Sequence, residues 1–82
     1  MEEIKVTKSL VDDLYEKICD YYATGQSYNL QESMDISKKL ETESKIDWLW
    51  WNDLATISAR RKATTLTLYA VIAMYGVEVV DR

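Results

Sequence analysis

One stretch decides the fold of this chain: residues 46–75 read IDWLWWNDLATISARRKATTLTLYAVIAMY. It contains no proline or glycine, and its apolar residues recur at helical spacing of about 100° per residue. The main apolar arc holds Ile46, Trp50, Leu54, Ile57, Thr64, Leu68, Ile72 and Tyr75. Aromatic and alanine strips widen this arc to more than half of the helical wheel. We therefore expect one long helix that is central in the fold or shared between subunits.

The end of this stretch also allows a second interpretation. Its β-branched residues are typical of strands, so residues 64–80 could form a hairpin interrupted by Gly76. We favour the helix because periodicity outranks propensity here, with Gly76 ending it and Val77 making an apolar contact behind it. The head of the chain, Ile4–Val6, and the tail, Val77–Val79, are candidates for a short two-stranded pairing.

Two shorter helices are expected before this stretch. Residues 8–23 carry apolar side chains at spacings of three and four, and Gly25 follows as a left-handed C-terminal residue. A second helix is predicted to start near Leu30, with Asn29 as its N-cap, and to end at 41–44. It holds few apolar residues, so we expect it to dock by a thin edge. The predicted fold is a single all-α, three-helix domain over residues 1–82.

Composition limits the classes of protein that this chain can belong to. The 82 residues contain one cysteine and no histidine, which excludes an internal disulfide and nearly every zinc-finger arrangement. A core this small favours oligomerisation. No signal peptide is visible, and the apolar run 63–75 is too short to span a bilayer, which needs about 20 residues. We expect a cytoplasmic protein without a membrane segment, and the unpaired Cys19 agrees with a reducing compartment.

Catalysis is not expected. Without histidine the commonest general base is missing, together with the usual activator of a serine or cysteine nucleophile. Cys19 lies on the apolar side of the first helix, as an inert structural thiol would. The sequence has no phosphate-binding glycine loop, no metal-ligand cluster and no cofactor motif. We expect neither an enzyme nor a cofactor or metal.

The residues that stand out are candidates for partner binding. Trp48, Trp50 and Trp51 point in different directions on a helix, so some belong to the core and at least one is a candidate surface anchor. Arg61 falls inside the main apolar arc, where a charge must pair with an acid, extend to solvent or mark an interface edge. The candidate partner-binding residues are Trp48, Trp51, Arg60, Arg61, Lys62 and Tyr69.

Charge is distributed unevenly along the chain. The net charge is −4, yet no acid occurs between Leu54 and Val77, where the cations 60–62 lie together. These cations are either a solvated face or, with a nearby tryptophan, a weak nucleic-acid site. The acids of the first two helices could imitate a nucleic acid, but four interspersed lysines make simple solubility the better interpretation.

These observations lead to two hypotheses of function. The leading one is a small non-enzymatic regulator or inhibitor that occludes or bridges a protein partner, as a homodimer formed through the third helix. The alternative is a small nucleic-acid-binding regulator that uses Arg60, Arg61 and Lys62.

Overall fold

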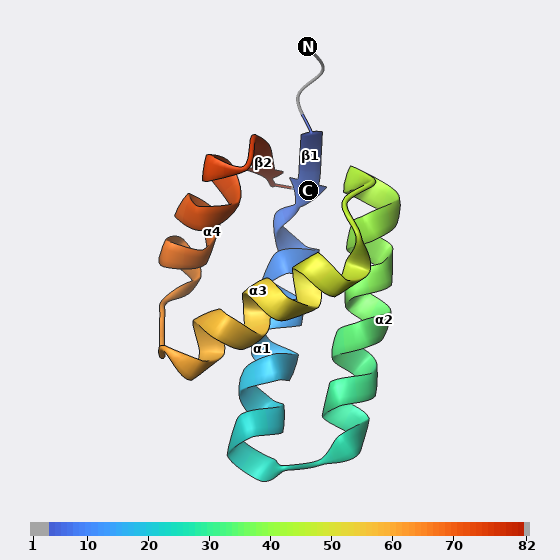
Figure 1. Ribbon diagram of the computed structural model, residues 1–82, viewed down its shortest axis with the longest axis vertical. Helices are drawn as coiled ribbons and strands as arrows, with labels where there is room; N and C mark the ends of the chain where they lie inside the picture. Colours follow the sequence, from blue (N-terminus) through green and yellow to red (C-terminus); the bar gives the residue numbers. More distant parts are fainter. Residues whose placement is uncertain (1–3, 82) are drawn as a thin grey trace.

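A computed structural model describes residues 4–81, and these form four helices between two short strands (Figure 1). Residues 1–3 and 82 of the predicted domain lie outside the described part. The elements are β1 (Ile4–Thr7), α1 (Lys8–Thr24), α2 (Ser27–Ser44), α3 (Trp48–Arg60), α4 (Thr65–Met74) and β2 (Val77–Val80). Helices α1 and α2 form an antiparallel hairpin that α3 crosses, while α4 lies along one edge. The all-helical class is confirmed, together with the pairing of the termini.

Helix α1 confirms the prediction for residues 8–23 to within one residue. Its buried residues Val11, Leu14 and Ile18 follow the helical spacing and form one side of the core. Gly25 ends the helix in the left-handed conformation, at φ 68°, and its N–H donates to the Tyr21 carbonyl. A residue with a Cβ is strained there, which explains the glycine.

Helix α2 starts earlier than expected, and most of the residues that it buries are polar and not the apolar residues that were predicted. It begins at Ser27, so Asn29 is not its N-cap; Asn29 is buried and donates from Nδ2 to Thr24 Oγ1 at 3.2 Å. Of the predicted thin apolar edge, Leu40 is buried and Ile36 packs half-buried against the core, but small polar residues form most of the buried edge. These buried polar residues of α2 are Asn29, Ser33, Ser37 and Ser44.

The continuous helix over 46–75 is wrong, because the chain breaks between α3 and α4. Lys62 has φ 54°, and Thr64 adopts an extended conformation in which its Oγ1 accepts from Thr67 N–H at 3.2 Å. Threonine side chains compete with helical hydrogen bonds in this way, so Thr64 caps a new helix instead of continuing the old one. The fold-back lets α4 bury Leu68 and Ile72, which a straight rod would carry away from the core.

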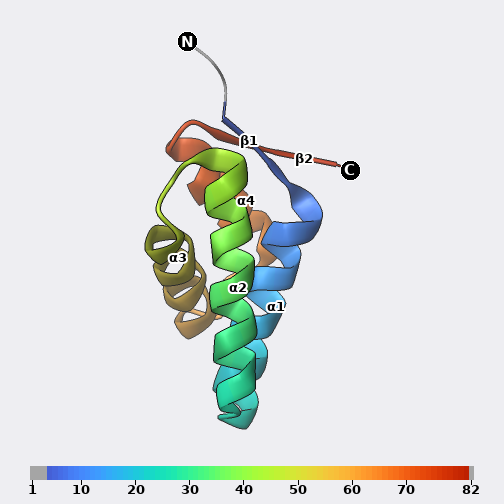
Figure 2. The ribbon, with the colours of Figure 1, turned by 90° about the vertical axis from the view of Figure 1, so that its right-hand side faces the viewer.

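The hairpin over 64–80 is also wrong, since only Val77–Val80 is extended and it pairs with the head of the chain. The pair is parallel, with Ile4 beside Val77 and Val6 beside Val79. Side chains of a strand alternate between faces, so these four apolar residues share one face. Gly76, at φ 80°, turns the chain from α4 into β2, and the buried Val77 follows it as expected. Figure 2 shows that the two paired strands lie at one end of the helices.

The core lies between α1, α2, α3 and the inner side of α4. It consists of Val6, Val11, Leu14, Ile18, Leu40, Trp51, Ala55, Leu68, Ile72 and Val77. Among residues 4–81, no helix combines the length and the apolar character needed to cross a membrane.

Candidate functional site

The tryptophans of α3 divide between core and surface. Trp51 is only 1% exposed, and its indole Nε1 donates to Ser44 Oγ at 3.0 Å. It is therefore a core residue and is not available to a partner, which corrects its place among the candidate contacts. Trp48 is half-buried, with Lys38 Nζ 5.4 Å from its ring centroid. Trp50 is half-buried too, and packs edge-on against Trp51 at 4.9 Å.

The three cations lie together at the corner between α3 and α4, and all are exposed. Arg60 is engaged with Tyr22: its Nε donates to the phenol oxygen at 3.0 Å, and its guanidinium lies over the ring. The expectation that Arg61 sits within an apolar arc is wrong, because α3 ends before it. Within the described residues Arg61 makes no ion pair, and Lys62 forms the turn. The structure thus gathers Arg60, Arg61 and Lys62 at the surface.

Tyr69 ties α4 to α1. Its half-buried phenol donates to Asp12 Oδ1. Burial, then the hydrogen bond to Asp12 and the charges of Asp12 and Asp81, raise the pKa of Tyr69 from 10.0 to about 12. Tyr15 makes a second tie by donating to the Ala63 carbonyl, and burial next to Cys19 raises the pKa of this phenol as well. Both tyrosines hold the α3–α4 segment against α1.

The shifted pKa of Tyr69 predicts an alkaline dependence of stability. The unfolded chain loses this proton near pH 10, whereas the folded chain keeps it to about pH 12. The contribution of Tyr69 to the free energy of unfolding is therefore fully present below pH 10 and is lost as the pH rises towards 12. Tyrosinate absorbance should show a titration near pH 12 that Tyr69→Phe removes. The raised pKa of Tyr69 would be contradicted if the difference in tyrosinate absorbance between the wild type and Tyr69→Phe titrated near pH 10.

The outer side of α4 is apolar and exposed. We name it the α4 face; it consists of Leu66, Thr67, Ala70, Ala73 and Met74. Leu66 is 75% exposed and Met74 84% exposed, although both are large aliphatic side chains. Periodicity alone did not find this face, because it made residues 65–74 the last part of one helix over residues 46–75. The signal that could have found it is the absence of any charged residue from 63 to 77.

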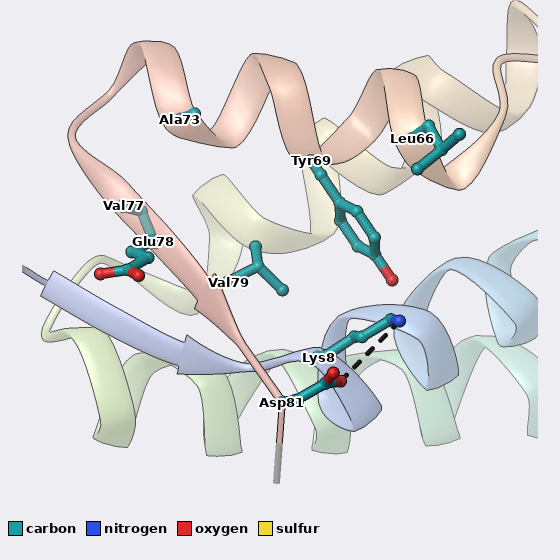
Figure 3. A pocket seen from close by; sticks show the side chains of 8 residues that line it. All are labelled: Lys8, Leu66, Tyr69, Ala73, Val77, Glu78, Val79 and Asp81. Atoms are coloured by element: carbon teal, nitrogen blue, oxygen red, sulfur yellow. Dashed lines mark ion pairs between the residues drawn. The ribbon is translucent and has the colours of Figure 1, made fainter.

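A hollow of about 450 Å³ separates α4 from β2 (Figure 3). Leu66, Tyr69 and Ala73 line it from the helix, and Val77 and Val79 line it from the strand. At one end, Lys8 Nζ lies 3.8 Å from an Asp81 carboxylate oxygen, in an ion pair that is largely exposed and therefore weak. The hollow is thus an apolar groove with a charged end.

In the part of the chain described, no three Cys, Asp or Glu side chains come together as metal ligands. This chain matches no protein-family model, no curated protein and no solved structure. Function is therefore argued from the surface of the chain.

Proposed function

We propose that this chain is a non-catalytic interaction protein of the cytoplasm that forms a homodimer through the α4 face and, as a dimer, occludes or bridges a protein partner. The observation that carries the proposal is the exposure of Leu66 and Met74 on a helix with no charged residue. Contiguous exposed apolar surface of this kind marks association sites in small proteins. Trp48, half-buried beside Lys38, remains a candidate contact for the further partner.

Charge favours a second copy of the chain as the occupant of the α4 face. A two-fold interface sets a surface against a copy of itself, so a surface with an excess of one sign of charge meets the same excess on the second copy. Residues 1–47 hold eleven acids against six bases, and that part of the surface would repel itself. Residues 63–77 hold no charge, so α4 can meet its copy without repulsion.

The spacing along α4 also suits an antiparallel pair. Ala70 lies at the middle of the face, and Leu66 and Met74 lie four residues to either side. In a two-fold pair that crosses at Ala70, each Leu66 therefore packs beside Met74 of the second copy. Alanine at the crossing allows the axes to approach to the short end of the usual range of about 8–10 Å.

The test is to place a charge on the α4 face. Met74→Glu should weaken the dimer by at least about tenfold, because each new carboxylate would be buried against the apolar Leu66 of the second copy without a partner of opposite charge. Sedimentation equilibrium over a range of protein concentrations measures the change. Met74 is almost fully exposed in one copy of the chain, so the fold of the protomer should be unaffected.

Tyr28→Glu is the matched control. Tyr28 is a large exposed side chain at 59%, and it lies in the first turn of α2, on a different helix from the α4 face. Tyr28→Glu adds the same charge as Met74→Glu and should leave dimerisation unchanged. A wild-type protein that stays monomeric at high concentration, or equal loss of dimer in both variants, would overturn the proposal.

The nucleic-acid alternative has less support. Exposure of Arg60, Arg61 and Lys62 at one corner is what it requires, but Arg60 already donates to Tyr22. Three cations on a chain of net charge −4 also provide little phosphate attraction. The protein partner therefore remains the better supported of the two.

A further inference from the structure

The two strands differ in how their outer edges are covered. Helix α2 packs against β1, where the Thr7 N–H donates to Glu43 Oε1 at 3.0 Å and the Thr7 hydroxyl donates to the same carboxylate. The outer edge of β2 has no such cover: in residues 4–81, the backbone of Val77–Val80 hydrogen-bonds to β1 alone. Alternate residues of a paired strand direct both backbone groups outward, so unpaired N–H and C=O groups line this edge.

The groove runs along the same strand. The hollow between α4 and β2 adjoins a second one of about 350 Å³, which is lined by Ala73, Gly76, Val77 and Glu78. Because the two share Ala73, Val77 and Glu78, they form one depression from the start of β2 to Asp81. An extended chain lying along β2 would direct every second side chain towards α4 and into this depression.

Glu78 is the one charged residue of β2, and it lies between the apolar residues Val77 and Val79. Val79 points into the hollow, whereas Glu78 points away from Tyr69 (Figure 3). Glu78 and Asp81 are the acids along this edge. Lys8 at its end is already paired with Asp81, whereas Lys5 lies beside Glu78 in the register of the strands without forming an ion pair with it within residues 4–81. An added strand with basic residues between its apolar ones would set a cation beside Glu78, and opposite charges on neighbouring strands stabilise a sheet.

We propose that β2 accepts an extended segment of a partner protein as a third strand, with apolar side chains in the α4–β2 hollow and basic side chains beside Glu78. This is strand addition, in which backbone hydrogen bonds supply affinity and alternate pockets supply specificity. The inference rests on the proposed role as an interaction protein. It uses the backbone edge of β2, and its hollow shares Leu66 and Ala73 with the α4 face but does not include the crossing point, Ala70.

A second copy of β2 fits this edge poorly. In an antiparallel pair, residues directly opposite each other point to the same face of the sheet. If a two-fold axis relates the two strands, one residue must therefore lie opposite its own copy, and the pairing is centred on that residue. Centring on Glu78 places two Glu78 carboxylates opposite each other, which destabilises the pair. Centring on Val79 places Asp81 opposite Val77 and brings a charge onto the apolar face. A foreign strand avoids both conflicts.

The experiment uses two synthetic peptides, acetylated and amidated, in which valine alternates with lysine or with glutamate over six residues. Each is titrated into the ¹⁵N-labelled full chain while its amide resonances are followed. The lysine peptide should shift the amides of Val77–Val80 and bind at least about tenfold more tightly than the glutamate peptide. Binding that shifts only resonances remote from β2, or equal affinity for both peptides, would overturn the inference.

Two variants and a matched control sharpen the test. Ala73→Trp fills the hollow from an exposed helical position and should weaken binding of the lysine peptide by at least about tenfold. Ala23→Trp is the matched control, because it makes the same change at an exposed position of α1 that lines neither the hollow nor the α4 face. Glu78→Lys should invert the preference between the two peptides. Full binding by Ala73→Trp or an unchanged preference in Glu78→Lys would contradict strand addition.

The two proposals fail separately. A monomeric wild-type chain that still binds the lysine peptide at β2 contradicts the homodimer and supports strand addition. A dimer that is sensitive to Met74→Glu but binds neither peptide supports the homodimer and overturns strand addition. Circular dichroism of each variant verifies that the helical fold is retained.

Discussion

Replacing Trp51 by alanine is expected to lower the free energy of unfolding by about 3–5 kcal/mol. Trp51 is the largest of the fully buried side chains, and it contacts Trp50 edge-on at 4.9 Å. Truncation to alanine leaves a cavity where α3 crosses α2 and removes the indole N–H that bonds to Ser44. A chain of this length has a total stability of about 4–12 kcal/mol, so the loss is at least about a quarter of the total and equals or exceeds it at the lower end of the range.

Urea denaturation followed by far-ultraviolet circular dichroism measures this effect. Trp48→Ala is the control, because Trp48 has the same side chain on the same helix but is only half-buried. Its loss removes a contact with Lys38, and such contacts contribute about 0.5–1 kcal/mol at exposed sites. Trp48→Ala should therefore cost well below half as much as Trp51→Ala. Equal losses would contradict the division of the tryptophans between core and surface.

Local signals predicted much of this fold. Residues 8–23 repeat apolar side chains at one spacing, and Gly25 ends the pattern with the only residue type that is unstrained at φ 68°. Gly76 followed by Val77 is an equally local signal, because it predicts that a helix ends and that an apolar contact follows. The alternating strands at the two termini also gave a correct pairing of Ile4–Val6 with Val77–Val79. Each of these rests on a few adjacent residues and a single physical rule.

The break between α3 and α4 depends on tertiary structure. Periodicity continues through residues 61–64, so no pattern there excludes a helix. The deciding terms are the capping bond from Thr67 N–H to Thr64 and the burial of Leu68 and Ile72 against helices far away in sequence. The same holds for the candidate site. The excess of apolar surface was predicted, but Leu66 and Met74 could be assigned to its exposed side only after the fold-back was known.

Helix α2 shows how a buried edge can be missed when burial is equated with apolar residues. Its edge against α1 consists largely of serines, and each hydroxyl donates to the carbonyl four residues earlier in α2 itself. The polar atoms are thus satisfied without any group from α1. Figures 1 and 2 show α1 and α2 side by side along most of their length. Because Ser33 and Ser37 are 0% exposed, we infer that this packed edge requires small side chains.

This argument predicts that Ser37 tolerates alanine and rejects leucine. Ser37 is 0% exposed and donates to the Ser33 carbonyl at 2.8 Å. Ser37→Ala loses that bond but leaves the carbonyl with its helical N–H partner, and alanine is the better helix former, so stability should change by no more than about 0.5 kcal/mol. Ser37→Leu inserts three extra carbons between packed helices and should cost about 1–3 kcal/mol.

Urea titrations of both variants distinguish size from polarity at this position. Thr42 is the control, because its hydroxyl makes the same type of bond, to the Lys38 carbonyl, on the exposed side of α2. Thr42→Leu should therefore be close to neutral, since nothing packs against it. A loss in Ser37→Ala as large as that in Ser37→Leu would mean that the hydroxyl, and not the space between α1 and α2, selects serine. The close approach of the two helices would then need a different explanation.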